Sequence, residues 1–406
     1  MKKQIINSLL DTDLYTFSVC YLYLNKFPRA EGKYEFFDRN KTVYPQGFAE
    51  KIMEQVKMME NIQITEDEVK FIKRKCYYLP EWFLTSFLQG YRFNASEVHF
   101  EQDEEGHLHG YAKGLLWRTI FWEVPLLAII SELAHEETGD KANIDEVISK
   151  TKEKYVKFNM NGIVFSDFGT RRRFSFDVQD AVVRTFAQCQ RETNTSHNMF
   201  GEVAKFVGTS NVLLAMKYDL TPVGTMSHQL ISGIGALFGY QEANYLAMDY
   251  WQQVYQADLG TYLYDTYGWD AFEKNFTKKH ANLFKALRVD SGDNIEQMSL
   301  IIDKYKSLDV DPTSKYITFS NALTTDDAIY IKKRAMGRIG VNFGIGTHFT
   351  CDIDNVRPMN IVMKLVEIRM TERTEWRKAV KLSNDHGKYT GDLDEVDLCK
   401  RTLRIK

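Results

Sequence analysis

The sequence predicts an α/β protein: an irregular (β/α) barrel with an N-terminal α/β domain packed against it. From about residue 160, eight short apolar runs alternate with helical stretches, which is typical of parallel βαβ units. The spacing between the runs is uneven, so an irregular barrel is favoured over a symmetric one. With 406 residues, the chain is long enough for a large core and for more than one domain.

Three regions are expected along the chain. Residues 1–135 would form the N-terminal α/β domain, and residues 136–368 the barrel that carries the active site. Residues 369–406 are polar and rich in lysine, and we expect this C-terminal segment to pack back on the N-terminal domain.

Two elements of the N-terminal domain have clear local signals. Residues 64–76 are predicted to form a helix, because Thr65 with Glu68 three residues later matches a capping box. Residues 98–112 alternate in polarity around a turn at 104–106, which indicates a β-hairpin.

The most apolar stretch of the chain covers residues 117–134. Arg118, Glu123 and Glu132 interrupt it, so a membrane span is not expected. We predict a buried strand followed by a helix, with Pro125 in the first turn of that helix.

The barrel strands are predicted at apolar runs that end in polar or glycine residues, and helices are predicted between several of them. The strands are 162–165, 205–207, 221–223, 260–264, 286–289, 316–319, 339–343 and 361–366. The helices include 212–218, 229–256, 294–308 and 326–335.

The composition argues against several classes of protein. A formal net charge of −3 is unlike that of proteins that bind nucleic acid through bulk positive charge. The five cysteines are scattered and contain no CxxC pair, which favours a reducing compartment and no zinc site. The first residues lack the apolar core of a signal peptide. We therefore expect a cytoplasmic protein without nucleic-acid or membrane partners.

The predicted strand ends are rich in glycines, hydroxyls, carboxylates and arginines. In barrels of this kind the active site lies at the carboxyl ends of the strands. Glycine turns there let backbone N–H groups approach an oxyanion, so these ends predict a phosphate-handling site. They are 166–171, 208–211, 224–228, 265–266, 290–293, 320–321 and 344–348.

Each of these segments has a plainer interpretation when it is taken alone. Residues 208–211 could be an ordinary helix cap, and the arginines at 171–173 a solvated surface run. Their shared position at one end of successive strands is what favours a site. Arg288 within an apolar strand end adds to this, since a buried guanidinium needs an anionic partner. Asp290 would lie on the same face two residues later.

Seven short motifs, spread over most of the chain, give the sequence a specific resemblance through their number and order. They are SLLDTDLY (8–15), WEVPLLAIISE (122–132), DFGTRRRFS (167–175), VGTSN (207–211), LRVDSGD (287–293), FGIGT (343–347) and NIVMKLVE (360–367). In these motifs the chain closely resembles the bacterial nicotinate phosphoribosyltransferases.

This resemblance implies an activity and its co-substrates. The phosphoribosyl group of phosphoribosyl pyrophosphate would pass to nicotinate, giving nicotinate mononucleotide and pyrophosphate in NAD salvage. ATP hydrolysis through a phosphohistidine would drive the reaction, with Mg²⁺ as cofactor. The family's fold is an irregular barrel with an N-terminal α/β domain, and its homodimers share active sites at the subunit interface.

For the nicotinate ring, the resemblance points to one aromatic pair and three polar side chains. Phe168 would stack on one face of the ring, and Tyr15 of the partner subunit on the other. Arg288 would bind the carboxylate bidentately, and Thr261 could add a hydroxyl contact. Ser210 stands where related nicotinamide enzymes carry Asp, which would repel nicotinate.

For catalysis, the resemblance makes His228 the phosphorylated histidine. An oxocarbenium-like transition state leaves charge on the departing pyrophosphate, so electrostatic stabilisation by Mg²⁺ and basic groups is expected. Asp265 and Asp290 would bind ribose hydroxyls or orient the Mg²⁺.

The phosphate contacts are assigned in the same way. Arg171 and the turn at Gly346 and Thr347 resemble the contacts to the 5′-phosphate and to groups near the ring. Arg39 of the partner subunit would reach the phosphates.

The chain departs from the family pattern at four positions. Gln229 follows His228 where Glu is usual, and an amide cannot act as a base in the same way. Asn321 stands where Asp is common, and Thr16 and His348 replace Lys and Arg. These changes bear on ATP coupling and on phosphate binding.

Other activities stay open at this point. A nicotinamide or quinolinate phosphoribosyltransferase is the nearest, although quinolinate needs more basic side chains at the ring site. A barrel phosphosugar isomerase or aldolase would need a Schiff-base lysine or an acid/base pair at strand ends, and Lys205 and Lys285 come too early in their strands. A non-enzymatic protein with this fold would bind substrates without turnover.

Overall fold

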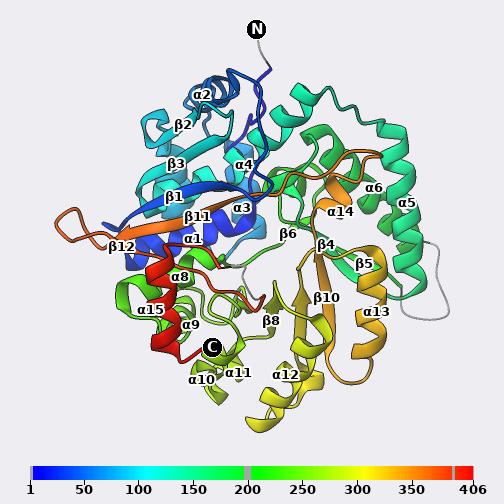
Figure 1. The fold of residues 1–406 in the computed structure, drawn as a ribbon. Helices are drawn as coiled ribbons and strands as arrows, with labels where there is room; N and C mark the ends of the chain where they lie inside the picture. The colour runs from blue at the N-terminus through cyan, green and yellow to red at the C-terminus, as the bar shows by residue number, and fades with distance from the viewer. Residues whose placement is uncertain (1–2, 196–202, 386–388, 406) are drawn as a thin grey trace.

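Two separate sheets and the helices around them make up the protein (Figure 1). The computed structural model describes residues 3–195, 203–385 and 389–405. One sheet is antiparallel and the other is parallel and curled, which confirms the predicted α/β class with an irregular barrel and a second α/β layer.

The antiparallel sheet is built mainly from the N-terminal part of the chain and is completed by two C-terminal strands. Strand β1 lies at its centre, between β11 and β3. In spatial order the strands are β12 (Arg377–Lys378), β11 (Ile361–Arg369), β1 (Glu31–Asp38), β3 (Leu108–Leu115) and β2 (Val98–Gln102).

The parallel sheet places seven strand ends along one edge. All of its described pairings are parallel, and β6 and β7 form the two outer strands without pairing to each other in the described residues. In spatial order they are β6 (Thr221–Pro222), β5 (Lys205–Thr209), β4 (Val164–Asp167), β10 (Gly340–Ile345), β9 (Tyr316–Phe319), β8 (Ala286–Val289) and β7 (Thr261–Leu263).

Helices cover both sheets, and in Figure 1 α5, α6 and α13 lie along the outer side of the parallel one. The α-helices are α1 (Leu14–Lys26), α2 (Phe48–Met59), α3 (Glu66–Lys75), α4 (Leu116–Thr138), α5 (Ile144–Met160), α6 (Phe176–Thr195), α7 (Val212–Lys217), α8 (His228–Phe238), α9 (Ala243–Tyr255), α10 (Trp269–Asn275), α11 (Lys278–Leu283), α12 (Asn294–Ser307), α13 (Thr325–Ala335), α14 (Thr347–Thr350) and α15 (Leu393–Leu403). Short helical turns are η1 (Phe83–Leu88), η2 (Ala95–Glu97), η3 (Thr170–Arg172) and η4 (Pro312–Ser314).

Several sequence predictions hold in detail. Strands β8 and β9 have the predicted bounds, and β2 pairs with β3 as the expected hairpin. The capping box at the start of α3 is present, with both the Thr65 and the Glu68 side chains bonded to the backbone. No helix in the described residues is long and apolar enough to cross a membrane.

The prediction of a strand followed by a helix over 117–134 is wrong, because α4 is one continuous helix with Pro125 in its interior. The proline removes the N–H that would bond to the carbonyl of Phe121, which ordinarily bends or breaks a helix. Here α4 is buried from Thr119 to His135 and contacts α1, α2 and three strands of the antiparallel sheet. A helix surrounded by core is apolar on every face, so it loses the 3.6-residue pattern that would have identified it.

Two further predictions about elements need correction. The run at 361–366 is not a barrel strand, since β11 pairs antiparallel with β1 in the other sheet. The single helix predicted over 229–256 is two helices, α8 and α9. Gly239 separates them with a φ of 102°, a conformation that favours glycine.

Candidate active site

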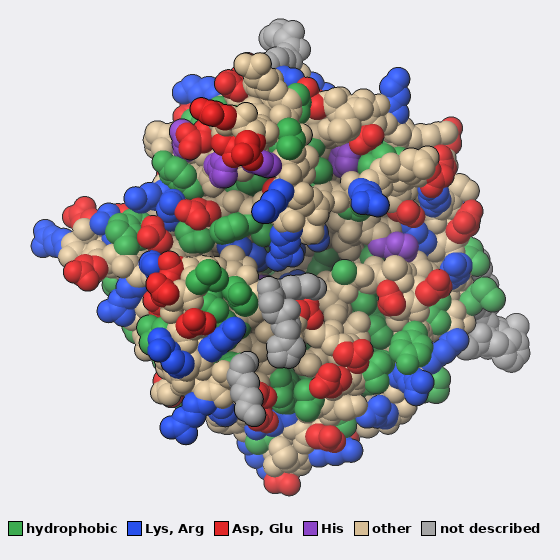
Figure 2. Space-filling model, viewed as in Figure 1, with side chains coloured by type: hydrophobic (Ala, Val, Ile, Leu, Met, Phe, Trp, Pro, Cys, Tyr) green, Lys and Arg blue, Asp and Glu red, His purple; other side chains and the backbone are tan. Residues whose placement is uncertain are grey.

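Charged and polar side chains converge where the strands of the parallel sheet end, beside β11 and the start of α1. Figure 2 shows lysine and arginine side chains gathered around the hollow at the middle of this face. The chain between β7 and α10, the start of α8 and the turn after β4 all contribute to this cluster.

A hydrogen-bonded group of four side chains forms the centre of the site. Asp290, just past β8, accepts from His228 Nε2 at 3.2 Å through Oδ2. Its Oδ1 accepts from Ser320 Oγ at 2.8 Å and from Arg288 Nη2 at 3.1 Å. Arg288 Nε also donates to Ser320 Oγ at 2.7 Å. The structure therefore brings together Arg288, Asp290 and His228 from β8 and α8.

Electrostatics fix the protonation of this group. Burial works against ionisation of Asp290, but Arg288 and His228 hold its pKa well below the usual range. Burial, with the charge of Lys381 nearby, lowers the pKa of His228, so its imidazole is neutral. Because an ionised Asp290 can only accept, Nε2–H of His228 donates to it. Nδ1 then accepts from Thr266 Oγ1 at 2.9 Å.

Asp265 adds a second carboxylate beside the histidine, with Oδ1 at 4.0 Å from His228 Nε2. Its Oδ2 accepts a short hydrogen bond from Ser291, and its buried Oδ1 has no hydrogen-bond partner in the described residues. Burial raises the pKa of Asp265 to about 6, with the charge of Lys381 opposing the shift.

The aromatic part of the site rests on a glycine. Phe168 lies against β10, where a Cβ on Gly344 would come within 2.4 Å of the Phe168 ring. The Arg288 guanidinium carbon lies 5.4 Å from the centre of that ring. The guanidinium thus lies over an aromatic surface, and an aromatic ring with a guanidinium is the chemistry that a planar aromatic carboxylate requires.

The N-terminal segment of the same chain completes this side of the site. The backbone N–H of Leu14 donates to Ser210 O at 2.9 Å, and Ser210 Oγ donates to Asp13 Oδ1 at 2.7 Å. Tyr15 follows directly, and the Arg171 guanidinium carbon lies 6.0 Å from its ring centre. Arg171 Nε is 3.5 Å from Asp13 Oδ2. Tyr15 of this chain therefore reaches its own chain's site.

The three adjacent arginines have different surroundings. Arg173 is fully buried, bonded bidentately to Asp11 at 2.6 and 2.9 Å and to Glu132 at 2.7 Å. Arg173 therefore joins the N-terminal segment to α4 through these ion pairs. Burial, with Arg171 and Arg39 nearby, lowers the pKa of Arg172 to about 10. Arg39 of this same chain is thus close to the arginine turn.

Not every predicted residue lies in the cluster. Thr261 begins β7 opposite Ala286, two residues before the level of Arg288, and no described contact joins it to the cluster. The hydroxyl near the histidine is that of Thr266, beyond the end of β7. Gly346 and Thr347 come directly after Ile345, the last residue of β10, and so lie at a strand end as predicted.

The four positions that depart from the family pattern also have defined partners. Gln229 donates a short hydrogen bond to Glu123 and not to the imidazole. Asn321 Nδ2 donates to Gly292 O at 3.1 Å, and His348 Nε2 lies 3.0 Å from Thr325 Oγ1. Thr16 Oγ1 lies 3.0 Å from Thr12 Oγ1, within the N-terminal segment.

Three charged residues of the site were not singled out from the sequence. Glu123 on α4 is buried and accepts from Tyr15 Oη at 2.9 Å. Lys364 on β11 lies close enough to Glu123 and Asp290 for their charges to act on it, while burial lowers its pKa to about 7. The charge of Lys381 contributes to the lowered pKa of His228. Lys364 and Glu123 stand within two of the recognised motifs, which was the available signal.

Two carboxylates of the site bear on Mg²⁺ binding. The described residues contain no group of three or more His, Cys, Asp or Glu side chains arranged to hold a metal ion. The unpartnered Oδ1 of Asp265 and the ionised Asp290 suit Mg²⁺, which binds through one or two carboxylates and substrate phosphates.

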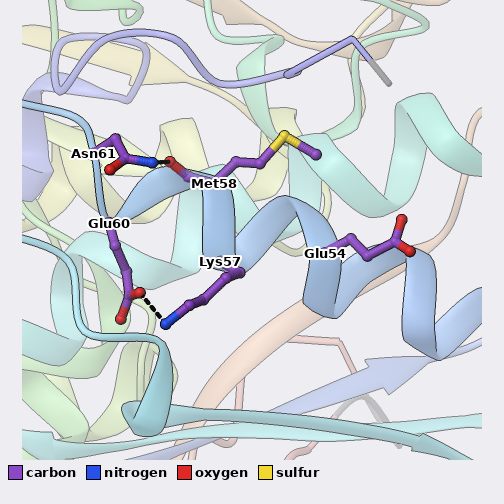
Figure 3. A pocket seen from close by; sticks show the side chains of 5 residues that line it. All are labelled: Glu54, Lys57, Met58, Glu60 and Asn61. Atoms are coloured by element: carbon purple, nitrogen blue, oxygen red, sulfur yellow. Dashed lines mark hydrogen bonds and ion pairs between the residues drawn. The ribbon is translucent and has the colours of Figure 1, made fainter. Parts of the chain in front are cut away.

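A depression on the far end of α2 offers a contrast. Figure 3 shows its lining, in which Lys57 pairs with Glu60 at 2.5 Å and Asn61 donates to Met58 O. It lies at the end of α2 with two glutamates and one lysine in its lining, and no strand end contributes to it. The lining residues are Glu54, Lys57, Met58, Glu60 and Asn61.

Comparison with known proteins accounts for this arrangement. Residues 163–406 match the nicotinate phosphoribosyltransferase (NAPRTase) family, and residues 10–131 match that family's N-terminal domain. The chain belongs to the nicotinate phosphoribosyltransferase family. Both halves of the site, the strand ends and the N-terminal segment with Tyr15, therefore fall within the matched regions.

Relatives of this family match along nearly the whole chain. A nicotinate phosphoribosyltransferase of Chromohalobacter salexigens is 39% identical, with 99% of each chain covered. One of Desulforapulum autotrophicum is 38% identical, covering 98% of this chain and 99% of the relative. The crystal structure of the nicotinate phosphoribosyltransferase from Porphyromonas gingivalis superposes with a TM-score of 0.94 at 44% identity, covering 99% of this chain and 100% of that one.

Proposed function

We propose that the protein transfers the phosphoribosyl group of phosphoribosyl pyrophosphate to nicotinate, forming nicotinate mononucleotide and pyrophosphate in NAD salvage. The observation that carries the proposal is the pairing of Phe168 with Arg288. Nη1 of Arg288 has no hydrogen-bond partner in the described residues, and only Nη2 is held by Asp290. The guanidinium can therefore bind a ring carboxylate while the ring lies on Phe168.

The charges around the ring site suit the departure of pyrophosphate. Arg171, Lys364 and Lys381 lie near enough to the anionic Asp290 for their charges to interact with it. Fixed cations placed where negative charge develops stabilise an oxocarbenium-like transition state. Mg²⁺ would be held by substrate phosphates with Asp265 or Asp290, and it would neutralise the leaving group.

We also propose that His228 accepts a phosphoryl group from ATP. The basic lone pair of its neutral imidazole is at Nδ1, where it accepts from Thr266 in this structure. Once the Thr266 hydroxyl turns away, that lone pair can attack phosphorus. The nitrogen–phosphorus bond would form as ADP leaves, and water would later cleave it to phosphate. Gln229 does not hinder this, because Thr266 and Asp290 orient the ring.

The oligomeric state and location remain proposals from the resemblance. A homodimer with shared active sites is expected, and within one chain Tyr15 already lies beside Arg171 and Glu123. A cytoplasmic location agrees with five unpaired cysteines. Light scattering of the purified protein would measure its mass in solution.

The direct test is an assay of nicotinate mononucleotide from nicotinate, phosphoribosyl pyrophosphate and Mg²⁺, with and without ATP. Product from nicotinate that ATP increases supports the proposal. Efficient product from nicotinamide or quinolinate instead would overturn the choice of base.

The role of His228 has its own test. His228→Asn should lose ATP stimulation while some ATP-independent synthesis remains, because the ring site is untouched. His99→Asn, at an exposed position of β2, is the control. ATP stimulation that survives in His228→Asn would contradict the assignment.

A further inference from the structure

Glu123 is a buried carboxylate with partners from three different elements. Its side chain is 2% exposed on α4. Oε2 accepts from Tyr15 Oη at 2.9 Å and from Gln229 Nε2. Oε1 lies 3.9 Å from Nη1 of Arg171, in the turn after β4. The proposed reaction steps give this carboxylate no role of its own.

Burying a carboxylate at this place destabilises the folded protein unless the carboxylate is paired. Burial raises the pKa of Glu123, and the charges of Arg171 and Lys364 oppose that shift. Without the Glu123 carboxylate, each of its partners would lose a hydrogen bond or ion pair inside the protein. The carboxylate therefore fixes the positions of these partners. Two of these partners, Tyr15 and Arg171, are the residues assigned to substrate contact.

We propose that Glu123 is a positioning residue for nicotinate binding. Its carboxylate holds the Tyr15 ring and the Arg171 guanidinium in their binding orientations, and Gln229 is its neutral third partner. The inference rests on the proposed function. It takes this chain's Tyr15, which lies beside Arg171, as the ring contact that the resemblance gave to the partner's Tyr15, and Arg171 as a phosphate contact.

The amide at position 229 fits this role. A carboxylate there would lie against Glu123, and two like charges at hydrogen-bond distance repel strongly in a buried site. The Gln229 amide donates instead, so the first turn of α8 is tied to α4 without added charge. His228 begins that same turn, and its imidazole keeps separate partners.

The test begins with Glu123→Gln, which keeps the shape and removes the charge. The nicotinate KM should rise about tenfold, which corresponds to about 1.4 kcal/mol of binding. The KM for phosphoribosyl pyrophosphate should change less, because other cations also bind phosphate. Glu132→Gln is the matched control on the same helix, where the buried carboxylate pairs with Arg173. It should lower thermal stability without a selective rise in nicotinate KM.

A double-mutant cycle with Tyr15→Phe identifies the path. If Glu123 acts through the Tyr15 hydroxyl, the effects of the two changes on nicotinate KM should be less than additive. Full additivity would overturn that path. Should Glu123→Gln fail to fold, Tyr15→Phe and Gln229→Leu remove its donors singly, and each should raise nicotinate KM by several fold. No rise in either would overturn the proposal.

Tyr15→Ala separates this inference from the proposed function. If Tyr15→Ala raises nicotinate KM while Glu123→Gln does not, Glu123 is not a positioning residue and the ring site stands. If Tyr15→Ala also leaves nicotinate KM unchanged, the assignment of Tyr15 to the ring is wrong. Product formation by the natural chain in the same assay tests the activity independently of both.

Discussion

Single side chains set the charge that a bound ring can carry, and Ser210 is the residue where this can be tested. Its hydroxyl donates to Asp13, whose carboxylate also faces Arg171. Ser210→Asp would put a second carboxylate beside Asp13. The added negative charge should repel nicotinate and tolerate the neutral nicotinamide.

We expect Ser210→Asp to lower kcat/KM for nicotinate by at least about tenfold and to raise the ratio of nicotinamide to nicotinate turnover. Steady-state kinetics with both bases would measure that ratio. Ser210→Asn, which adds size without charge, is the control and should change the ratio much less. An unchanged ratio in Ser210→Asp would remove Ser210 from the specificity site.

At the scale of one element, β10 supports the ring site because Gly344 has no side chain. Gly344 leaves room for the Phe168 ring, and a Cβ there would fall 2.4 Å from it. Gly344→Ala should push the ring out of place and raise nicotinate KM by about tenfold, with the fold retained. Gly139→Ala is a control for a glycine with no neighbour within 4 Å, and its cost should appear in stability alone. Kinetics and thermal unfolding of both variants would check this.

The elements that the sequence predicted well are those with local signals. The Thr65 and Glu68 cap and the strands β8 and β9 need only neighbouring residues to be recognised. Helix α4 could not be predicted this way, because core surrounds it on all sides and Pro125 is a local signal that packing overrides. Nor could the pairing of β11 with β1, since pairing between distant strands leaves no trace in either strand.

The candidate site shows the same division. The strand-end residues Arg288, Asp290 and His228 follow from position alone, because parallel strands end at one edge. Glu123 and Lys364 lie on α4 and β11, outside the parallel sheet, and only the folded chain brings them to that edge. Thr261 begins β7, two residues before the level of Arg288, and its contact with the ring stays a prediction.

For the whole molecule, the site concentrates charge at a cost in stability. Two lysines and several arginines crowd two neighbouring carboxylates, and burial makes each charge more expensive. The buried pairing of Arg173 with Asp11 and Glu132 helps to hold this group together across the two sheets. Stability given up at a functional site is expected to return when a charge is removed.

The cost of burying Lys364 should appear in how the free energy of unfolding changes with pH. Burial and the charge of Lys381 lower its pKa to about 7, whereas a lysine in the unfolded chain has a pKa of about 10.4. Between these values the unfolded chain binds the proton and the folded chain releases it, so stability rises with pH across the window. Each pH unit contributes at most about 1.4 kcal/mol.

We therefore expect Lys364→Met to be more stable than the natural chain near neutral pH, with the difference shrinking towards about pH 10. Activity should also fall if, as proposed, Lys364 helps to stabilise the departing pyrophosphate. Urea unfolding of both proteins without ligands, at several pH values, would measure the difference, and groups common to both cancel in it. Lys205→Met, on an exposed residue at the start of β5, is the control. A stability difference for Lys364→Met that is constant with pH would mean that the folded chain keeps this lysine charged.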